Sequence, residues 1–277
     1  MNDVRVLAEG LGMGKSARWH GGRFWYADWL KGHIHAMDPA GTDHQSIPVP
    51  SFPISFDWLP DGHLLIVSGS ECKLLRLSPA GTLEDVADLG RHLASPWNEV
   101  VTAGPNAYVN CSGFTFPGPA AVAGIIALVT PDGASRVVAD GLAYPNGMVD
   151  TDDGGTLVVA ESYAGRLTAF DIQLDGSLAN RRVWAAVPDS APDGICWGGG
   201  GIWYADVGQR HCVLVAEGGE VLDTVSLEQG CFSCAMGGDD GKTLYVMVAD
   251  WPGVMDQSLP VSGRVLAVRI KEKGSPT

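Results

Sequence analysis

Residues 193–206 read DGICWGGGGIWYAD, and this pattern decides the fold because related copies of it occur along the whole chain. In each copy a short apolar segment is followed by a turn that contains glycine and then by a second apolar segment. Short apolar segments separated by turn residues are typical of β-strands. The clearest copies fall in residues 17–28, 56–67, 98–110, 146–161, 193–206 and 233–248.

The positions that open these six units are regularly spaced. Successive openings are separated by 40, 43, 48, 47 and 40 residues. A period of about 40–50 residues with four short strands per unit is the signature of a β-propeller. The sequence therefore predicts an all-β fold, a six-bladed β-propeller. The opening positions are Lys15, Ser55, Asn98, Asn146, Asp193 and Ser233.

The two ends of the chain carry the pattern that closes the ring. Residues 4–7 and 265–270 both have the composition of strands. An open edge strand invites aggregation, so we expect the N-terminal strand to join the last blade as its outermost strand. No linker interrupts the repeats, and residues 1–277 are expected to form a single propeller domain.

Composition narrows the class of protein. Glycine accounts for 37 of the 277 residues, and 45% of the residues are hydrophobic, which suits a turn-rich chain with a large core. A net charge of −14 argues against nucleic acid as a partner, because phosphate binding needs Lys and Arg. The sequence has neither a basic start followed by an apolar stretch nor an apolar run long enough to span a membrane. We expect a cytoplasmic protein with a small-molecule substrate and no membrane partner.

The cysteines give little support for a metal or redox site. Most of the six lie in apolar segments, and the CxxC formed by Cys231 and Cys234 has no second pair at ligand spacing. Free, buried thiols are the interpretation that this pattern favours.

Polar side chains stand where the innermost strands of the blades begin. The pattern places Lys15, Asn98, Asn146 and Asp193 in a ring near one end of the central channel. Asn and Asp are depleted in strands, so their repetition at equivalent positions indicates a site. Such a set could hold a divalent cation, or a water between a carboxylate base and an electrophile. The form x-Pro-[Asn/Asp]-Gly occurs twice, at 144–147 and 191–194.

At these residues the chain resembles the family of gluconolactonases, regucalcin (senescence marker protein) and luciferin-regenerating enzymes. The resemblance implies a six-bladed propeller and a metal-dependent lactonase, with one divalent cation (Ca, Zn, Mn or Mg) held by Glu, two Asn and Asp. By motif, Asn98, Asn146 and Asp193 match three of these ligands. The resemblance also implies that Asp193 accepts a proton from the attacking water while the cation polarises the carbonyl. The matching stretches are 10–19, 144–148, 160–167, 192–196 and 203–206.

The departures from the family concern the first blade. The family's Glu falls on Lys15, its Pro two residues later falls on Ala17, and its sugar-contacting Arg is matched by Pro96. An ammonium cannot ligate a cation and repels it. Four alternatives follow for Lys15: it turns away from a three-ligand metal; its ammonium replaces the cation; its amine forms a Schiff base; or it forms a structural ion pair with Asp193 in an inactive site.

Two further residues are candidates for substrate contact. Trp97 either lines the pocket beside Asn98 or packs in the core, and Tyr163 is expected to border the channel mouth. The loop at 113–124 either covers one mouth or is a surface insertion. The leading hypothesis is a hydrolase that opens a lactone or related cyclic ester. The alternatives are a metal-independent lysine enzyme and a non-catalytic binding propeller.

Overall fold

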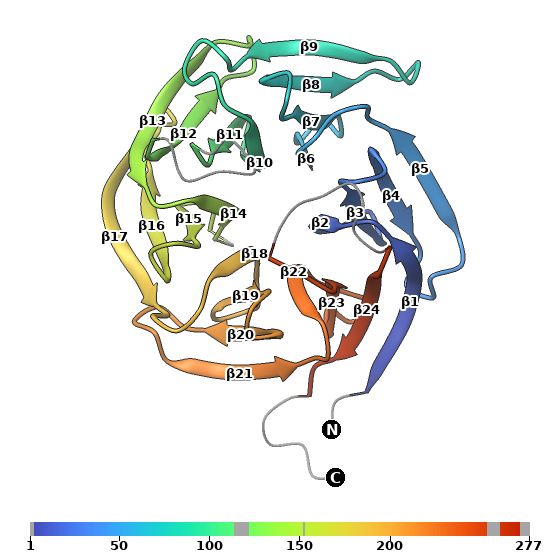
Figure 1. The fold of residues 1–277 in the computed structure, drawn as a ribbon. Coiled ribbons are helices and arrows are strands. Elements are labelled where there is room, and N and C mark those ends of the chain that lie inside the picture. Colours follow the sequence, from blue (N-terminus) through green and yellow to red (C-terminus); the bar gives the residue numbers. More distant parts are fainter. Residues whose placement is uncertain (1–2, 114–121, 152, 254–260, 272–277) are drawn as a thin grey trace.

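The chain folds into six four-stranded antiparallel sheets arranged in a ring (Figure 1). The computed structural model describes residues 3–113, 122–151, 153–253 and 261–271. Within these ranges every regular element is a strand, which confirms the predicted six-bladed β-propeller. Nothing in the described ranges forms a helix with the length and hydropathy needed to cross a bilayer.

Each blade runs outward from the channel in chain order. The innermost strands are β2 (Gly14–His20), β6 (Ile54–Trp58), β10 (Trp97–Ala103), β14 (Pro145–Asp150), β18 (Pro192–Trp197) and β22 (Gly230–Gly237). The second strands are β3 (Arg23–Asp28), β7 (Leu64–Ser68), β11 (Asn106–Cys111), β15 (Thr156–Glu161), β19 (Ile202–Asp206) and β23 (Thr243–Ala249). The third strands are β4 (His33–Met37), β8 (Lys73–Leu77), β12 (Gly124–Val129), β16 (Arg166–Ile172), β20 (His211–Val215) and β24 (Gly263–Arg269). The outermost strands are β5 (His44–Pro48), β9 (Leu83–Asp88), β13 (Ser135–Leu142), β17 (Leu178–Ala186), β21 (Val221–Ser226) and β1 (Val4–Leu11).

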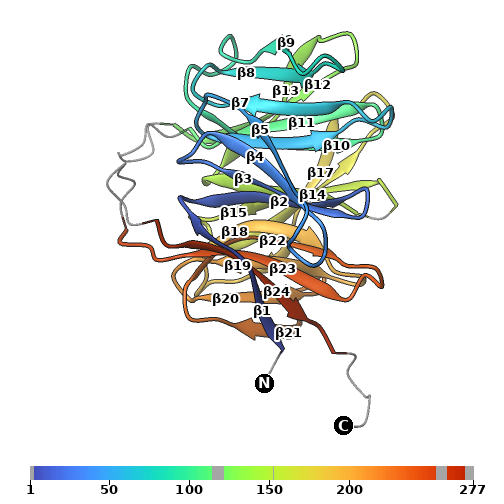
Figure 2. The same cartoon turned by 90° about the vertical axis from the view of Figure 1, so that its right-hand side faces the viewer.

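The ring closes as the sequence predicts. Strand β1 pairs antiparallel with β24, with Val4 opposite Val268, and so becomes the outermost strand of the sixth blade. Both views show the blue β1 beside the red β24 (Figures 1 and 2). The first and last segments of the chain thereby share one sheet.

The hydrophobic core is divided among the interfaces between blades. Trp97, Val109 and Leu74 belong to one cluster between the second and third blades, and Phe24 and Tyr245 belong to another between the first and sixth. Large side chains such as these exclude water from both faces of the inner strands. Polar side chains on the inner strands therefore lie in a buried environment.

Candidate active site at one mouth of the channel

The inner strands carry irregularities where their polar residues lie. In β2 the pairing register shifts between Lys15 and Arg18, and in β18 it shifts between Pro192 and Ile195. Similar shifts occur in β10, β14 and β22, whereas β6 pairs regularly with its neighbour. A β-bulge redirects side chains that would otherwise alternate between the two faces of a sheet. These bulges turn the polar side chains toward the channel.

Glycine follows two of the polar residues because neighbouring inner strands approach closely there. A Cβ on Gly147 would lie 2.6 Å from the main-chain oxygen of Asp193, and a Cβ on Gly194 would lie 2.5 Å from Ser233 Oγ. Such contacts are shorter than packed atoms allow. The duplicated x-Pro-[Asn/Asp]-Gly form therefore permits the close packing of adjacent blades beside the site.

Lys15 and Asp193 form a buried ion pair across the channel. Lys15 Nζ donates to Asp193 Oδ1, and the two residues are only 5% and 7% exposed. The ammonium also lies 5.0 Å from the ring centroid of Trp29 and 5.9 Å from that of Phe232. Aromatic faces attract a cation at such distances. Three groups therefore stabilise the charge on Lys15: one carboxylate and two rings.

The surroundings of Asp193 change its acidity. Burial raises the pKa of the Asp193 carboxyl above its ordinary value, and the nearby positive charge of Lys15 only partly opposes this. The negative charge of Glu99 adds to the increase. A carboxylate with a raised pKa is a stronger base than one in water.

A chain of amide and hydroxyl groups continues the site beside the ion pair. Asn98 Nδ2 donates to Asn146 Oδ1 at 3.2 Å, and Asn146 Nδ2 donates to Ser162 Oγ at 3.4 Å. Ser162 Oγ donates in turn to the main-chain oxygen of Pro192 at 2.7 Å. The structure thus brings four of the predicted residues, Lys15, Asn98, Asn146 and Asp193, to one end of the channel. Ser162 is an additional member that the repeat pattern did not indicate, since it follows a second strand rather than opening an inner one.

The two predicted substrate contacts have different positions. Trp97 is 0% exposed and packs in the core, where its indole N–H donates to the main-chain oxygen of Leu93. This position favours the core interpretation of Trp97 over contact with a substrate. Tyr163 is 66% exposed and stacks on Tyr144, with ring centroids 4.7 Å apart. Of the loop at 113–124, residues 114–121 lie outside the described residues.

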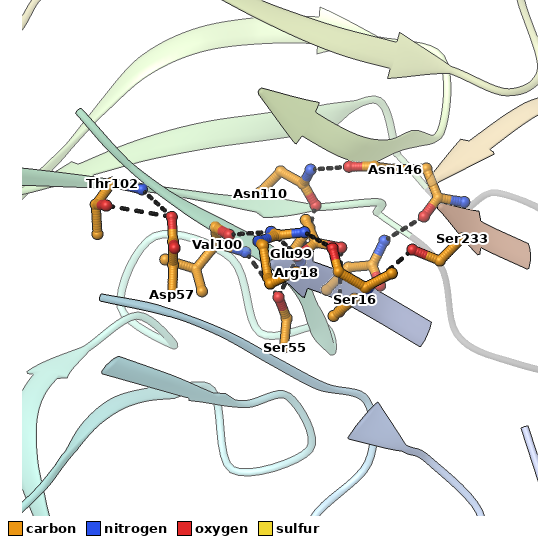
Figure 3. A network of polar contacts seen from close by, with 12 residues as sticks. Ser16, Arg18, Ser55, Asp57, Glu99, Val100, Thr102, Asn110, Asn146 and Ser233 are labelled. Atoms are coloured by element: carbon orange, nitrogen blue, oxygen red, sulfur yellow. Dashed lines mark hydrogen bonds and ion pairs between the residues drawn. The ribbon is translucent and has the colours of Figure 1, made fainter. Parts of the chain in front are cut away.

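Glu99 is the functional candidate that sequence reasoning missed. It is buried below the mouth, where it accepts hydrogen bonds from Arg18 Nη2 at 2.8 Å, Ser16 Oγ at 3.2 Å and Ser55 Oγ. Figure 3 shows this network, in which Asn110 links the main-chain N–H of Glu99 to the main-chain oxygen of Asn146. Asp57 is hydrogen-bonded to Thr102 and interacts with Arg18 only through charge. The available signal was a charged residue directly after Asn98 in an inner strand that continues with Val100 and Val101.

The donor set does not fit a divalent cation at this mouth. The ammonium of Lys15 is paired with the carboxylate of Asp193, and the amide oxygen of Asn146 accepts a hydrogen bond from Asn98. Among the described residues, no group of three or more His, Cys, Asp or Glu side chains could hold a metal ion. Hard cations need several free, preferably anionic, oxygen ligands.

The thiols are free, as the sequence predicts, and four of the six are buried, whereas Cys72 and Cys196 are partly exposed. All six cysteines are free, including the pair in the CxxC. Burial raises the pKa of Cys196 and Cys212 well above the ordinary value. Thiols of this kind are poor nucleophiles at neutral pH.

The fold and the site together define a class of protein, the six-bladed propellers that carry buried polar groups at one mouth of the channel. Within that class, the chain belongs to the SMP-30/gluconolactonase/LRE-like family, whose model matches residues 13–250. This confirms the resemblance inferred from the motifs.

Solved structures agree with the fold. A luciferin-regenerating enzyme is similar at a TM-score of 0.82 and 18% identity, over 97% of this chain and 95% of that one. A calcium-binding protein, regucalcin, from Agrobacterium tumefaciens has a TM-score of 0.76 and 18% sequence identity, over 98% of this chain and 96% of that one. A gluconolactonase from Xanthomonas campestris has a TM-score of 0.76 and 18% sequence identity, over 96% of this chain and 90% of that one. At this level of identity the likeness concerns the propeller fold.

Proposed function

We propose that this protein is a hydrolase that opens a lactone or a related cyclic ester at the mouth where Lys15 and Asp193 meet. The buried pairing of an ammonium with a carboxylate of raised pKa is the observation that carries the proposal. Membership of a family that includes gluconolactonases supports this reaction class.

In the proposed mechanism Asp193 is the general base. It takes a proton from water as the water oxygen bonds to the carbonyl carbon of the substrate. The ring C–O bond then breaks, and Asp193 returns the proton to the leaving alkoxide to give a hydroxy acid. General-base catalysis of this kind contributes about 10²–10⁴-fold to the rate.

Lys15 supplies the positive charge that the reaction needs. An ammonium has three N–H donors, and in this structure one of them points to Asp193. The other two are available to a carbonyl oxygen, whose negative charge grows in the tetrahedral intermediate. Asn98 and Asn146 orient that carbonyl through their amide groups. The mechanism contains no step through a divalent cation, because the donor set does not fit one.

The test is turnover of a panel of lactones by Asp193→Asn and by a matched control, Asp223→Asn. Asp223 lies on the outermost strand β21 of the same blade, far out from the channel. We expect a fall of about 10²–10⁴-fold for Asp193→Asn, with the control unchanged and both variants folded by circular dichroism. Retained activity in a folded Asp193→Asn variant would remove this residue from the mechanism.

The metal question has its own measurement. We expect the purified protein to contain no stoichiometric Ca, Zn, Mn or Mg, and Lys15→Glu to gain one cation, because the substitution adds a carboxylate ligand to Asn98, Asn146 and Asp193. A stoichiometric cation in the unaltered protein would overturn the assignment of its role to Lys15.

The Schiff-base alternative receives less support from the geometry. Nucleophilic lysines are desolvated among apolar groups or placed beside another cation, whereas Lys15 is paired with a carboxylate. Borohydride treatment with a carbonyl substrate should leave no mass adduct on Lys15, and an adduct would restore this alternative. The absence of turnover across the lactone panel would favour the non-catalytic binding propeller.

A further inference from the structure

A second cavity lies at the opposite end of the channel from Lys15 and Asp193. Its volume is about 220 Å³, and residues from the inner strands of all six blades line it. Each inner strand begins at the active-site mouth, so residues three positions further along lie about 10 Å away. The lining residues used below are Arg18, Asp57, Met148, Asp150, Trp197 and Met236.

A buried ion pair separates this cavity from the active site. Arg18 Nη2 donates to Glu99 Oε1 at 2.8 Å and to the main-chain oxygen of Val100 at 2.9 Å. Arg18 Nη1 donates to the main-chain oxygen of Ala17 at 3.0 Å. Figure 3 shows Arg18 and Glu99 between Asp57 on one side and Asn146 on the other. A ligand in the cavity therefore meets a different set of groups from a ligand at Lys15.

The charge of the cavity is negative. Arg18 is the cation on its wall, and the charge of Arg18 interacts with both Glu99 and Asp57. Asp57 accepts hydrogen bonds from the main-chain N–H of Thr102 at 2.7 Å, its hydroxyl at 3.2 Å and the N–H of Trp58 at 2.9 Å. These donors are neutral, and Arg18 offsets part of the charge of Asp57. Asp150 adds a second carboxylate on the wall.

The rest of the wall is apolar and polarisable. Met148, Trp197 and Met236 line it together with aliphatic side chains. Indole rings attract cations through their faces, and the thioether sulfur of methionine makes favourable contacts with aromatic rings. The cavity is equal to roughly seven waters in volume, at about 30 Å³ for each. That volume suits a molecule with one ring.

We propose that this cavity binds a small organic cation, in which an ammonium group faces Asp57 and Asp150 and an apolar body contacts Met148, Trp197 and Met236. Carboxylates outnumber the one guanidinium here, because Arg18 faces Glu99, Asp57 and Asp150, and this excess of negative charge favours a cation. The apolar wall selects the body. This site is independent of the hydrolase proposed above.

Three probes of nearly equal size test the proposal: benzylammonium, benzyl alcohol and benzoate. Isothermal titration calorimetry with the whole protein gives their dissociation constants. We expect benzylammonium to bind at least about tenfold more tightly than benzyl alcohol, because one hydrogen bond to a charged group contributes about that ratio in the dissociation constant. Benzoate should bind most weakly. Added salt should weaken the binding of benzylammonium and leave the binding of benzyl alcohol unchanged. Equal binding of the three, tighter binding of benzoate, or no binding up to millimolar concentrations would each overturn the proposal.

Variants locate the bound cation. Asp57→Asn and Asp150→Asn should each raise the dissociation constant of benzylammonium about tenfold, and two such variants keep the test valid should one fail to fold. Asp223→Asn is the matched control, because Asp223 Oδ1 accepts the next residue's N–H at 2.7 Å as Asp57 Oδ1 does at 2.9 Å. The dissociation constant of benzylammonium should be the same for Asp223→Asn as for the unaltered protein. Weaker binding in Asp193→Asn, with unchanged binding in the two cavity variants, would place the cation at the other mouth and refute the inference.

Discussion

Substitution of Lys15 by methionine tests how strongly the channel excludes water from the ion pair. Methionine is an apolar side chain of similar length, but it has no ammonium, so it loses the cation–π contacts with Trp29 and Phe232 and leaves Asp193 without its cation. Breaking a buried pair by removing one partner costs about 3–5 kcal/mol. We therefore expect the free energy of unfolding at pH 8 to fall by about 3–5 kcal/mol.

The loss should depend on pH. The folded-state pKa of Asp193 lies above its ordinary value because the carboxyl is buried, and removal of Lys15 raises it further. At pH values below the pKa of Asp193 in the unfolded chain, Asp193 is neutral in both the folded and the unfolded state, so there is no cost of burying an unpaired carboxylate. As pH rises through the folded-state pKa, the penalty appears in full. The destabilisation of Lys15→Met should thus be large at pH 8 and small at pH 4.

Urea-induced unfolding, followed by tryptophan fluorescence at both pH values, measures this effect. The double variant Lys15→Met/Asp193→Asn is the control, since it removes both charges and should recover most of the stability lost in the single variant. A loss below about 1 kcal/mol at pH 8, which is typical of exposed pairs, would refute the argument. So would a loss that does not change with pH.

Three further predictions follow from the same structure. Gly194→Ala should lower the free energy of unfolding by about 1–3 kcal/mol, because the new Cβ would lie 2.5 Å from Ser233 Oγ; Gly155→Ala, whose nearest neighbours lie 3.5 Å away on the Asp153 side chain, should change it little. Glu161 is buried, which by itself raises its pKa, but hydrogen bonds from Arg166 and Thr168 outweigh this and lower it. Its contribution to stability should therefore be present at neutral pH and lost as pH falls through the folded-state pKa, and Glu161→Gln should reduce that acid sensitivity in urea titrations. Lactone turnover should rise with pH to a midpoint above the ordinary aspartate value, because burial raises the pKa of Asp193; a midpoint at or below about 3.9 would contradict its assignment as the base.

The sequence predicted the propeller because the repeat is encoded locally. Short apolar segments and glycine turns specify strands, and their period specifies blades. The same symmetry predicts that Lys15, Asn98, Asn146 and Asp193 lie at one end of the channel, since equivalent positions in a ring converge on its axis. The closure of the ring by the N-terminal strand, predicted at residues 4–7 and observed as Val4–Leu11, followed from the cost of an open edge.

The contacts inside the site were beyond the reach of the sequence. Four alternatives for Lys15 were compatible with its position in the chain. The ion pair with Asp193 depends on the diameter of the ring and on bulges that turn both side chains inward. Bulges arise from the packing of adjacent blades, which a single strand does not encode.

The sequence by itself determined the architecture, the family and the ring of polar positions at one mouth. Only the tertiary structure decided that Lys15 is paired with Asp193, that Trp97 belongs to the core, and that Glu99 is paired with Arg18 below the mouth. The physical reason is distance along the chain. Strand and turn preferences act over a few residues, whereas Lys15 and Asp193 are 178 residues apart and meet only when six blades have closed around one axis.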